Sequence, residues 1–582
     1  MAHRIADQLI ARLAEAGVER IYGVVGDSLN PVTDALRLNN KVKWVHVRNE
    51  EAGAFAAGAE AQLTGKLAAC AGSCGPGNLH LINGLFDAHR SNAPVLAIAS
   101  HIPSSEIGTG YFQETHPQNL FQECSHYCEL ITNPAQFERV LHIAMQNAIG
   151  KGGVGVVVLP GDVVALEVPP TAGSRSLVTK LPSVRPGEKD LARLADLINS
   201  SKKVALLCGI GCENAHDQVV ALAEKVKAPV GHSYRGKPFV EYDNPYDVGM
   251  TGMIGFGMCY EAIHECDLLL LLGTDFPYDK FLPTNCKIAQ IDIRVERLGR
   301  RSKIDLGIWG DVRETLQALL PMLDGKQDRA FLGTTLAKHK EKLQKMNVYV
   351  DHVGKRLPMH PEPVAAALSE AAAPDAIFTA DTGMCNVWSA RYIKATKDRR
   401  IIGSFNHGSM ANALPMAIGA QCAYPGRQVI SMSGDGGLAM LMGDLLTITQ
   451  YDLPIKVLVF DNGALGMVKL EMETGGFPDY QTDLKNPNFA KVAEAIGMMG
   501  VRIENPADLT SGLKKALQHP GPALIDVVTD PNALSIPSHA DRSQAVGFAL
   551  ALGKMVLAGN LEEVADTVKG NIRHIGESLE SI

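Results

Sequence analysis

The chain has 582 residues, of which 46% are hydrophobic and 20% are charged. At roughly 150 residues per domain, this length predicts three or four folded domains with sizeable cores. The formal net charge is −8 and no long basic run occurs, so nucleic acid is excluded as an expected partner. The longest apolar runs, such as the one near Leu270, are too short to span a bilayer.

The first predicted element is an amphipathic helix near the N-terminus. Within residues 1–23 the apolar side chains Ile5 and Leu9 alternate with the charged Arg4 and Asp7. A signal peptide needs an uninterrupted apolar stretch, so we expect a cytoplasmic protein. Its eleven cysteines are then expected to be reduced and mostly packed in cores. Core packing also explains CSHYC at 124–128 better than metal binding does.

Strand-like apolar runs alternate with helical runs along nearly the whole chain. In chain order they include IYGVVG at 21–26, PVLAIAS at 94–100, KVALLCG at 203–209, IAQIDI at 288–293 and QVISMSGDG at 428–436. Continuous Val/Ile/Leu strands separated by amphipathic helices are typical of parallel sheets that helices cover on both faces. We therefore predict the α/β fold class, with doubly wound parallel-sheet domains.

Two changes in composition suggest where the domains meet. Residues 168–188 are rich in Pro, Gly and Ser, and residues 337–363 are polar and rich in Lys. The predicted domains are 1–180, 181–345 and 346–530, followed by a C-terminal helical tail at 531–582.

Ligands of parallel sheets bind at the carboxyl ends of the strands, so residues that follow a strand are the candidates for chemistry. Glu50 and Glu51 follow the strand WVHV and precede a helix rich in small residues. The turn at 209–211 begins an incomplete GxGxxG motif, with Asn214 in the place of the third glycine. Asp292 ends IAQIDI, where an acid suits a ribose hydroxyl group or an ordinary turn.

The most specific motif is the acid between two glycines at Gly434, Asp435 and Gly436. A glycine-rich turn that opens a helix presents backbone N–H groups to an anion. A carboxylate beside that anion requires a cation between them, and Mg²⁺ commonly bridges carboxylates and phosphates. The next predicted strand ends at Asn462, whose amide oxygen would reach the same ion. A single GDG is usually only a turn, but the pair of motifs is much more specific.

This pair of motifs resembles the signature of thiamine-diphosphate enzymes. The resemblance implies that Asp435, Asn462 and the backbone oxygen of Ala464 hold Mg²⁺ on the diphosphate of the cofactor. It also implies that Glu50 bonds to the aminopyrimidine ring and activates the cofactor, although Asn49 replaces the usual His of the segment. Without the resemblance, Glu50 and Glu51 would be read as solvated residues at a helix start. The implied cofactor contacts also include Gly434, Gly436, Gly437, Leu465 and Gly466.

Longer segments at 71–90, 101–118, 241–256 and 404–415 are similar to the FAD-containing, quinone-linked pyruvate oxidases of this family. The resemblance implies that the first domain binds the pyrimidine, the second binds FAD and the third binds the diphosphate. The implied FAD contacts are Thr251, Gly252, Met253, Ile254, Thr274, Asp275, Phe276, Pro277, Tyr278, Asp292 and Asp311.

Further pocket residues follow from the same resemblance. Gly408, Ser409 and Met410 are expected beneath the cofactor, where Met410 holds it in a bent form or simply packs in the core. Phe112 and Gln113 resemble residues that line the reaction pocket. Met467 stands where related enzymes can place a Phe linked to electron transfer. The resemblance also implies that Glu50 and Asp435 of one active site come from different subunits. Such a site requires a dimer, and members of the family are usually tetramers, so we expect a homotetramer.

The expected reaction is oxidative decarboxylation of pyruvate to acetate and CO2, with electrons passed through FAD to a membrane quinone. One alternative is the carboligation of 2-keto acids by an acetolactate synthase, and another is a non-catalytic nucleotide-binding relative. In the tail, Leu561, Val564, Ala565, Val568, Ile572 and Ile575 share one helical face. By resemblance this tail binds a lipid surface, which places the protein in the cytoplasm, peripherally attached to the inner face of the cell membrane.

Overall fold

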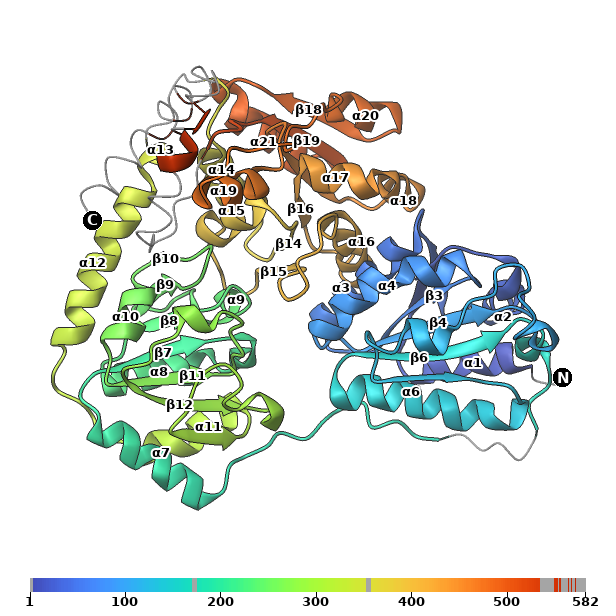
Figure 1. Ribbon diagram of the computed structural model, residues 1–582, viewed down its shortest axis with the longest axis horizontal. Helices are drawn as coiled ribbons and strands as arrows, with labels where there is room; N and C mark the ends of the chain where they lie inside the picture. Colours follow the sequence, from blue (N-terminus) through green and yellow to red (C-terminus); the bar gives the residue numbers. More distant parts are fainter. Residues whose placement is uncertain are drawn as a thin grey trace.

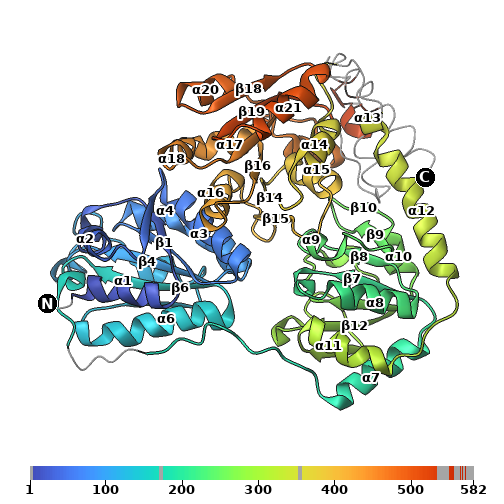
Figure 2. The same cartoon turned by 180° about the vertical axis from the view of Figure 1, so that it is seen from behind.

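The structure is a computed structural model that describes residues 4–169, 175–351 and 357–533, together with 549–552, 554, 555, 564, 567 and 571. Figure 1 shows three lobes in chain order, coloured blue to cyan, green, and orange to red. The view from behind in Figure 2 shows the same three-lobed arrangement. Each lobe is built around one sheet, and each sheet lies inside one of the three predicted segments. The limits of the domains stay predictions.

The first domain contains a six-stranded sheet in the order β2-β1-β3-β4-β6-β5, with all neighbours parallel. Its strands are β1 (Arg20–Gly23), β2 (Lys43–His46), β3 (Ala68–Gly72), β4 (Val95–His101), β5 (Tyr127–Leu130) and β6 (Val154–Pro160). Its helices are α1 (Ile5–Glu15), α2 (Asn30–Asn39), α3 (Glu50–Thr64), α4 (Pro76–Arg90), α5 (Pro117–Leu120) and α6 (Phe137–Lys151). The predicted N-terminal helix is therefore present as α1.

The middle domain contains a seven-stranded sheet in the order β10-β9-β8-β7-β11-β12-β13. Its strands are β7 (Val204–Cys208), β8 (Val230–His232), β9 (Asp247–Met250), β10 (Phe256–Gly257), β11 (Leu268–Leu272), β12 (Lys287–Asp292) and β13 (Leu306–Trp309). Its helices are α7 (Glu188–Ser200), α8 (His216–Val226), α9 (Lys237–Val240), α10 (Cys259–Glu265), α11 (Val312–Leu319) and α12 (Ala330–Met346). Only the short edge pair β9–β10 is antiparallel within this sheet.

The third domain contains a six-stranded parallel sheet in the order β15-β14-β16-β17-β19-β18. Its strands are β14 (Ile377–Ala380), β15 (Arg400–Gly403), β16 (Val429–Gly434), β17 (Lys456–Asp461), β18 (Met499–Ile503) and β19 (Ala523–Val528). Its helices are α13 (Val348–Asp351), α14 (Pro361–Ala371), α15 (Met384–Tyr392), α16 (Ala413–Ala423), α17 (Asp435–Leu441), α18 (Leu445–Gln450), α19 (Gly466–Thr474), α20 (Phe489–Ala495) and α21 (Leu509–Leu517). Counted in chain order, its strands follow the same 2-1-3-4-6-5 arrangement as those of the first domain.

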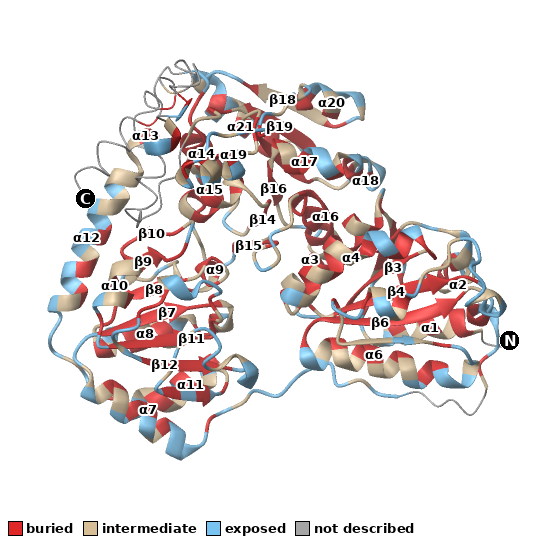
Figure 3. Ribbon diagram, in the orientation of Figure 1, coloured by how far each residue is buried: buried red, intermediate tan, exposed pale blue. Residues whose placement is uncertain are grey.

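Several central strands are buried along their whole length because helices cover both faces of each sheet. Every residue of β4 and β6 is buried, as is every residue of β7 and β11. Figure 3 shows the same pattern, with buried strands in all three lobes and exposed residues on the outer helices. The predicted α/β fold class with three parallel-sheet domains is confirmed. Most of the predicted tail lies outside the described residues.

The first and third domains share one hydrophobic core where α3 packs on α16. Ala54, Ala56 and Ala57 of α3 belong to the same buried cluster as Leu414 and Ile418 of α16. Small side chains let the two backbones approach closely: a Cβ at Gly419 would overlap the carbonyl oxygen of Ala56. This contact fixes how the two sheets lie relative to each other.

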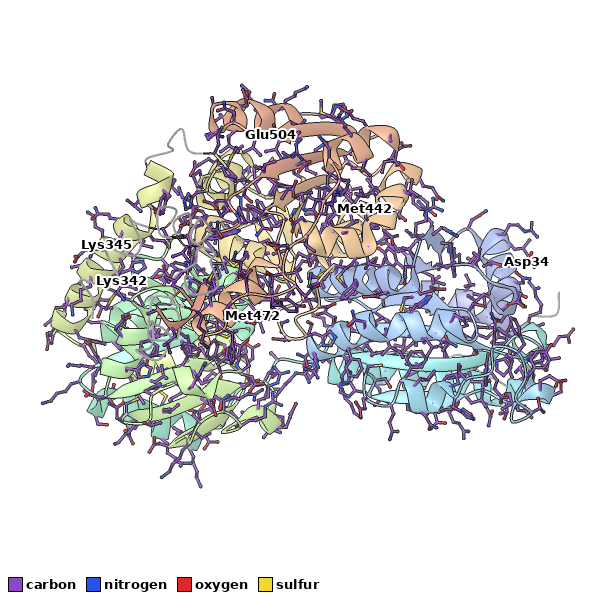
Figure 4. The ribbon with its side chains drawn as sticks, turned by 45° about the horizontal axis from the view of Figure 1, so that its top comes forward. Asp34, Lys342, Lys345, Met442, Met472 and Glu504 are labelled. Carbon is purple, nitrogen blue, oxygen red and sulfur yellow. The ribbon has the colours of Figure 1, made fainter. Side chains whose placement is uncertain are left out.

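The middle domain is tied to the third by α12 and by single hydrogen bonds. Figure 4 marks Lys342 and Lys345 on α12, along the outer edge of the middle lobe, and Lys342 pairs with Glu261 of α10 in the same domain. At the end of α12 the Met346 carbonyl accepts the Tyr392 hydroxyl of the third domain over 3.1 Å. Arg391 of the third domain donates to the Gly255 carbonyl oxygen over 3.1 Å. The segment that follows β9 is therefore held against the third domain.

We expect Gly419→Ala to lower the stability of the protein. The added methyl group must displace the α3 backbone, and overpacking of this kind costs about 1 to 3 kcal/mol. The unfolding midpoint in a thermal melt should fall by about 3 to 8 °C. Gly426→Ala is the matched control, because a Cβ there meets no atom within 4 Å. Equal melting temperatures for the two variants would contradict this account of the α3–α16 contact.

Candidate functional site

Asp435 directly follows the carboxyl end of β16 and is the first residue of α17. It is 2% exposed. Its Oδ1 accepts the Gly436 N–H over 2.7 Å. Its Oδ2 accepts the Gly463 N–H over 2.7 Å and the Asn486 side-chain amide over 2.8 Å. Burial raises the pKa of Asp435 to about 6, against the effect of these neutral donors.

Asn462 follows β17 and opens a loop that reaches the same edge of the sheet. Its Oδ1 accepts the Ala464 N–H over 3.3 Å. The loop is held from the other side, because Leu484 N donates to the Gly463 carbonyl over 2.7 Å and Leu465 N donates to the Thr482 carbonyl over 2.8 Å. The two predicted motifs are thus joined through Gly463, which donates to Asp435.

A cavity that is open to solvent lies at this edge. It is at the topological switch point between β14 and β16, where doubly wound sheets bind ligands. The predicted residues that line it are Met410, Gly434, Asp435, Gly436, Gly437, Asn462, Ala464, Leu465, Gly466 and Met467. Lining residues that the sequence analysis missed include Thr382, Gly383, Met384, Trp388 and Thr529.

The donor set of this cavity fits a magnesium diphosphate. A carboxylate, an amide oxygen and a main-chain carbonyl are hard oxygen ligands, which Mg²⁺ prefers. Within the described ranges, no three His, Cys, Asp or Glu side chains gather in a metal cluster. A metal here would therefore use amide and main-chain oxygens beside Asp435. The buried hydroxyl of Thr382, at the cavity wall, has no hydrogen-bond partner among the described residues. A buried polar group of this kind is expected to bond to a ligand.

Asp381 anchors the loop that carries Gly408, Ser409 and Met410. Burial raises the pKa of Asp381 to about 7, and its Oδ1 accepts both the backbone N–H and the side-chain amide of Asn412, over 3.2 and 3.0 Å. Asn412 also donates to the Ser409 carbonyl over 2.8 Å. Met410 thereby reaches the cavity wall. A Cβ at Gly437 would overlap Asp381 Oδ2, so this glycine is needed for the anchor.

Glu50 begins α3 in the first domain and is 7% exposed. Its Oε2 lies 2.9 Å from Nδ1 of His80, a partner that the sequence analysis missed. Asn49 accepts the Glu51 N–H over 2.9 Å and so caps the helix. No residue of 4–169 lines the third-domain cavity. Within one chain, the structure therefore does not bring Glu50 to Asp435.

Phe112 and Gln113 lie in an exposed loop of the same domain. The Phe112 side chain is 78% exposed, which is unusual for a large apolar group. Gln113 adopts a positive φ of 62° and accepts a hydrogen bond from the Cys74 thiol over 3.2 Å. Like Glu50, neither residue lines the cavity of its own chain.

The segments predicted for FAD follow β9, β11 and β12 at one edge of the middle sheet. Thr251 is 2% exposed, and its hydroxyl has no hydrogen-bond partner in the described structure. Asp292 is 3% exposed, burial raises its pKa, and its Oδ1 accepts the Arg294 N–H over 2.9 Å. An unpartnered buried hydroxyl group and a buried acid at one strand edge fit a nucleotide cofactor.

Other predicted residues of this domain have structural partners. Asp275 forms ion pairs with Arg300 and Arg301. Asp311 caps α11 by accepting the Glu314 N–H over 3.1 Å. In the incomplete GxGxxG motif, a Cβ at Gly211 would lie 2.6 Å from the Gly273 Cα, so these glycines let two turns pack closely.

Trp309 is a further candidate for a contact with FAD, and the sequence analysis missed it. It lies on β13 in register with Asp292 of β12, is 55% exposed, and donates its indole N–H to the Ile293 carbonyl over 3.0 Å.

At CSHYC, burial raises the pKa of Cys124 and Cys128 to about 12, as expected of packed thiols.

Three family models match the chain in the same order as its domains. They are the thiamine pyrophosphate enzyme N-terminal TPP binding domain at residues 3–121, the central domain at 191–319 and the C-terminal TPP binding domain at 381–527. A Bacillus subtilis protein described as thiamine pyrophosphate-containing is 35% identical over 94% of this chain and 96% of its own. The chain belongs to the thiamine pyrophosphate enzymes.

Two further relatives carry different activities in their names. A pyruvate oxidase of Lactiplantibacillus plantarum is 31% identical over 90% of this chain and 88% of its own. An acetolactate synthase large subunit of Parasynechococcus marenigrum is 31% identical over 90% of this chain and 87% of its own. Family membership is thus clear, while similarity alone does not choose between the two reactions.

The described part of the tail packs on the third domain. Ala551 and Met555 are buried, and Lys554 donates to the Gly476 carbonyl over 2.8 Å. Of the predicted apolar face, Val564 is among the described residues, whereas Leu561, Ala565, Val568, Ile572 and Ile575 lie outside them. None of the helices in the described ranges has both the length and the apolar character needed to cross a bilayer.

We expect Asn486→Ala to weaken magnesium-dependent binding of thiamine diphosphate by about 10- to 100-fold. Asn486 donates to Asp435 and also to Asp461, over 2.8 Å each, and holds the Asp435 carboxylate in place. Titration calorimetry at several Mg²⁺ concentrations would measure the affinity. Asn488→Ala is the control, because Asn488 only caps α20 by accepting the Lys491 N–H. Equal affinities for the two variants would sink this role for Asn486.

Proposed function

We propose that this thiamine pyrophosphate enzyme oxidatively decarboxylates pyruvate to acetate and CO2 and passes the electrons through FAD to a membrane quinone. The observation that carries the proposal is that two sheets of one chain have buried polar groups at the carboxyl ends of their strands, where ligands bind. One of these places is the oxygen-lined cavity around Asp435, and the other is the middle-sheet edge with Thr251 and Asp292. A second nucleotide edge supports a redox cofactor beside thiamine diphosphate. The resemblance of the longer segments to quinone-linked pyruvate oxidases points to the same reaction.

Each part of the chain has a defined task in this proposal. When bound, thiamine diphosphate supplies an electron sink for decarboxylation and FAD accepts two electrons. Asp435, Asn462 and the Ala464 carbonyl would hold Mg²⁺, and the glycines at 434, 436 and 437 leave room for the diphosphate. Residues 1–180 would bind the pyrimidine ring, 181–345 FAD, and 346–530 the diphosphate.

Glu50 would hold a proton at the pyrimidine ring, and its partner His80 would keep the carboxyl group oriented. Because Glu50 lies outside the cavity of its own chain, the proposal places it at the cavity of a partner chain. The exposed Phe112 and the half-buried Gln113 would line the same pocket from the partner, opposite Met410 and Met467. This arrangement requires at least a dimer with active sites between subunits, and the resemblance supports a homotetramer.

Quinone reduction requires contact with a membrane, which we assign to the tail at 531–582. The resemblance to quinone-linked enzymes supports this assignment, and the protein would then be cytoplasmic and peripherally attached to the inner face of the cell membrane. The flanking charges of the tail are mixed, so attraction to anionic lipid contributes little. Its apolar face supplies the lipid contact in this proposal.

Acetolactate synthase is the competing function, and its 31% identity favours it as much as the oxidase. A non-catalytic relative would have no chemical use for Glu50, Asp435 and Asn462 together. The oxidase and the synthase differ in what happens to the flavin: the oxidase reduces it in every turnover, whereas the synthase has no net redox step.

We expect pyruvate to bleach the flavin absorbance of the purified protein under anaerobic conditions with thiamine diphosphate and Mg²⁺. The electron pair left by decarboxylation has FAD as its acceptor. A soluble quinone should then restore the absorbance while acetate forms. Accumulation of acetolactate with the flavin still oxidised would assign the synthase reaction. Protein purified without any flavin would contradict the FAD site itself.

We expect Glu50→Gln to lower the turnover number with pyruvate by at least about 100-fold, the usual range for a lost proton-transfer group. Glutamine keeps the size of the side chain but carries no titratable proton. Glu51→Gln is the matched control, because its amide oxygen can still accept from Asn83, as Glu51 Oε1 does over 2.7 Å. Steady-state kinetics with matched cofactor loading would compare them. Unchanged turnover in Glu50→Gln would rule out the proposed proton position.

A further inference from the structure

Two cysteines of the middle domain lie in contact at the amino ends of neighbouring strands. Cys266 directly follows α10 and lies just before β11, Cys286 precedes β12, and their sulfur atoms are 3.9 Å apart. Leu268 of β11 is in register with Lys287 of β12, so the two chain segments enter the sheet side by side. Adjacent strands lie about 4.8 Å apart. Cys266 and Cys286 are one position out of this register, and a disulfide allows about 4.4 to 6.8 Å between Cα atoms, so the bond fits segments that run this close.

The two thiols differ in access to solvent. Cys286 is partly exposed and lies in a surface stretch with the exposed Asn285 and Lys287, whereas Cys266 is 6% exposed. The Cys266 thiol donates to the Cys286 sulfur and lowers the pKa of the Cys286 thiol. A small oxidant therefore reaches Cys286 first and meets the Cys266 thiol beside it.

Other cysteine pairs of the domain do not offer this combination. Cys208 and Cys212 are both fully buried, so an oxidant in solution has no path to either sulfur. The segments proposed for FAD, 274–278 and Asp292, leave the carboxyl ends of β11 and β12. The cysteine pair lies at the opposite ends of these strands and is not part of that cofactor edge.

We propose that Cys266 and Cys286 form a modification site that hydrogen peroxide oxidises to a disulfide. The Cys286 thiolate attacks one peroxide oxygen, the O–O bond breaks, and a sulfenic acid and hydroxide form. Hydroxide takes up the proton that Cys286 released. The Cys266 sulfur then attacks the Cys286 sulfur, and its proton leaves with the hydroxyl group as water. Two thiols lose two electrons, and peroxide is reduced to two waters.

The bond closes the segment 267–285, which contains β11 and the turn at 274–278. Closing a segment of this length restricts the unfolded chain more than the folded one and so stabilises the domain. We expect the oxidised protein to melt about 2 to 6 °C higher than the reduced protein. Reduction with dithiothreitol should reverse the shift.

The test treats the full-length protein with graded hydrogen peroxide, blocks free thiols with an alkylating reagent, and maps the peptides by mass spectrometry. The expected product is one peptide pair linked through Cys266 and Cys286, lighter by about 2 Da than the two thiol peptides. Cys266→Ser and Cys286→Ser should each abolish the link and the melting shift. Cys128→Ser, at another partly exposed cysteine, is the matched control and should keep both.

Three outcomes would overturn the proposal. They are full alkylation of both cysteines after peroxide treatment, accumulation of Cys286 as a sulfinic acid without the link, and a link that joins either cysteine to a different partner. The peptide map of the wild-type protein decides among them even where a serine variant folds poorly. None of these readouts depends on pyruvate turnover or on FAD, so the result is independent of the proposed function.

Discussion

The close contact of α3 with α16 is the constraint on which the candidate site depends. Its backbones meet because Ala56 and Gly419 face each other, and larger residues there would push the helices apart. Glu50 is the first residue of α3, and the loop that carries Met410 ends where α16 begins. The contact that joins the two domains therefore also fixes the starting points of both elements that present functional side chains. Small residues in these helices serve position as much as core volume.

The first and third domains use one strand order for two different tasks. Helix α3 of the first domain packs against helix α16 of the third, and the two domains share a hydrophobic core there. The third sheet presents a carboxylate and an amide at its switch point, which suits a metal and a diphosphate. The first sheet presents Glu50, which is held by His80 and does not line the third-domain cavity of its own chain. The proposed site between two chains would bring Glu50 of one chain to the cavity of the other.

Much of the fold could be predicted from the sequence because its signals are local. Continuous apolar strands indicate parallel sheets, and Asp435 and Asn462 were predicted because each follows its strand directly. Asn486 was not predicted, since a tertiary contact brings it to Asp435 from a separate loop and no local pattern marks it. Asp381 was missed although it follows β14 directly, as Asp435 follows β16. Asp311 shows a different limit: the resemblance implied a cofactor contact, which stays a prediction, and in the structure Asp311 caps α11. Local spacing cannot distinguish these two uses.

The electrostatics of the third domain explain why a cation from solution suits this edge. Arg502 pairs with Asp526 and Asp461, so the protein itself supplies positive charge to both acids. Asn486 links Asp461 to Asp435, but a neutral amide cannot compensate a negative charge. In the described part of the chain, all hydrogen-bond donors to Asp435 are neutral, and burial raises its pKa to about 6. Among the described residues Asp435 thus has no cation as a partner, although it is almost fully buried. A divalent ion beside Asp435 would offset that desolvation, and the adjacent glycine N–H groups would bind the anion that the ion brings with it.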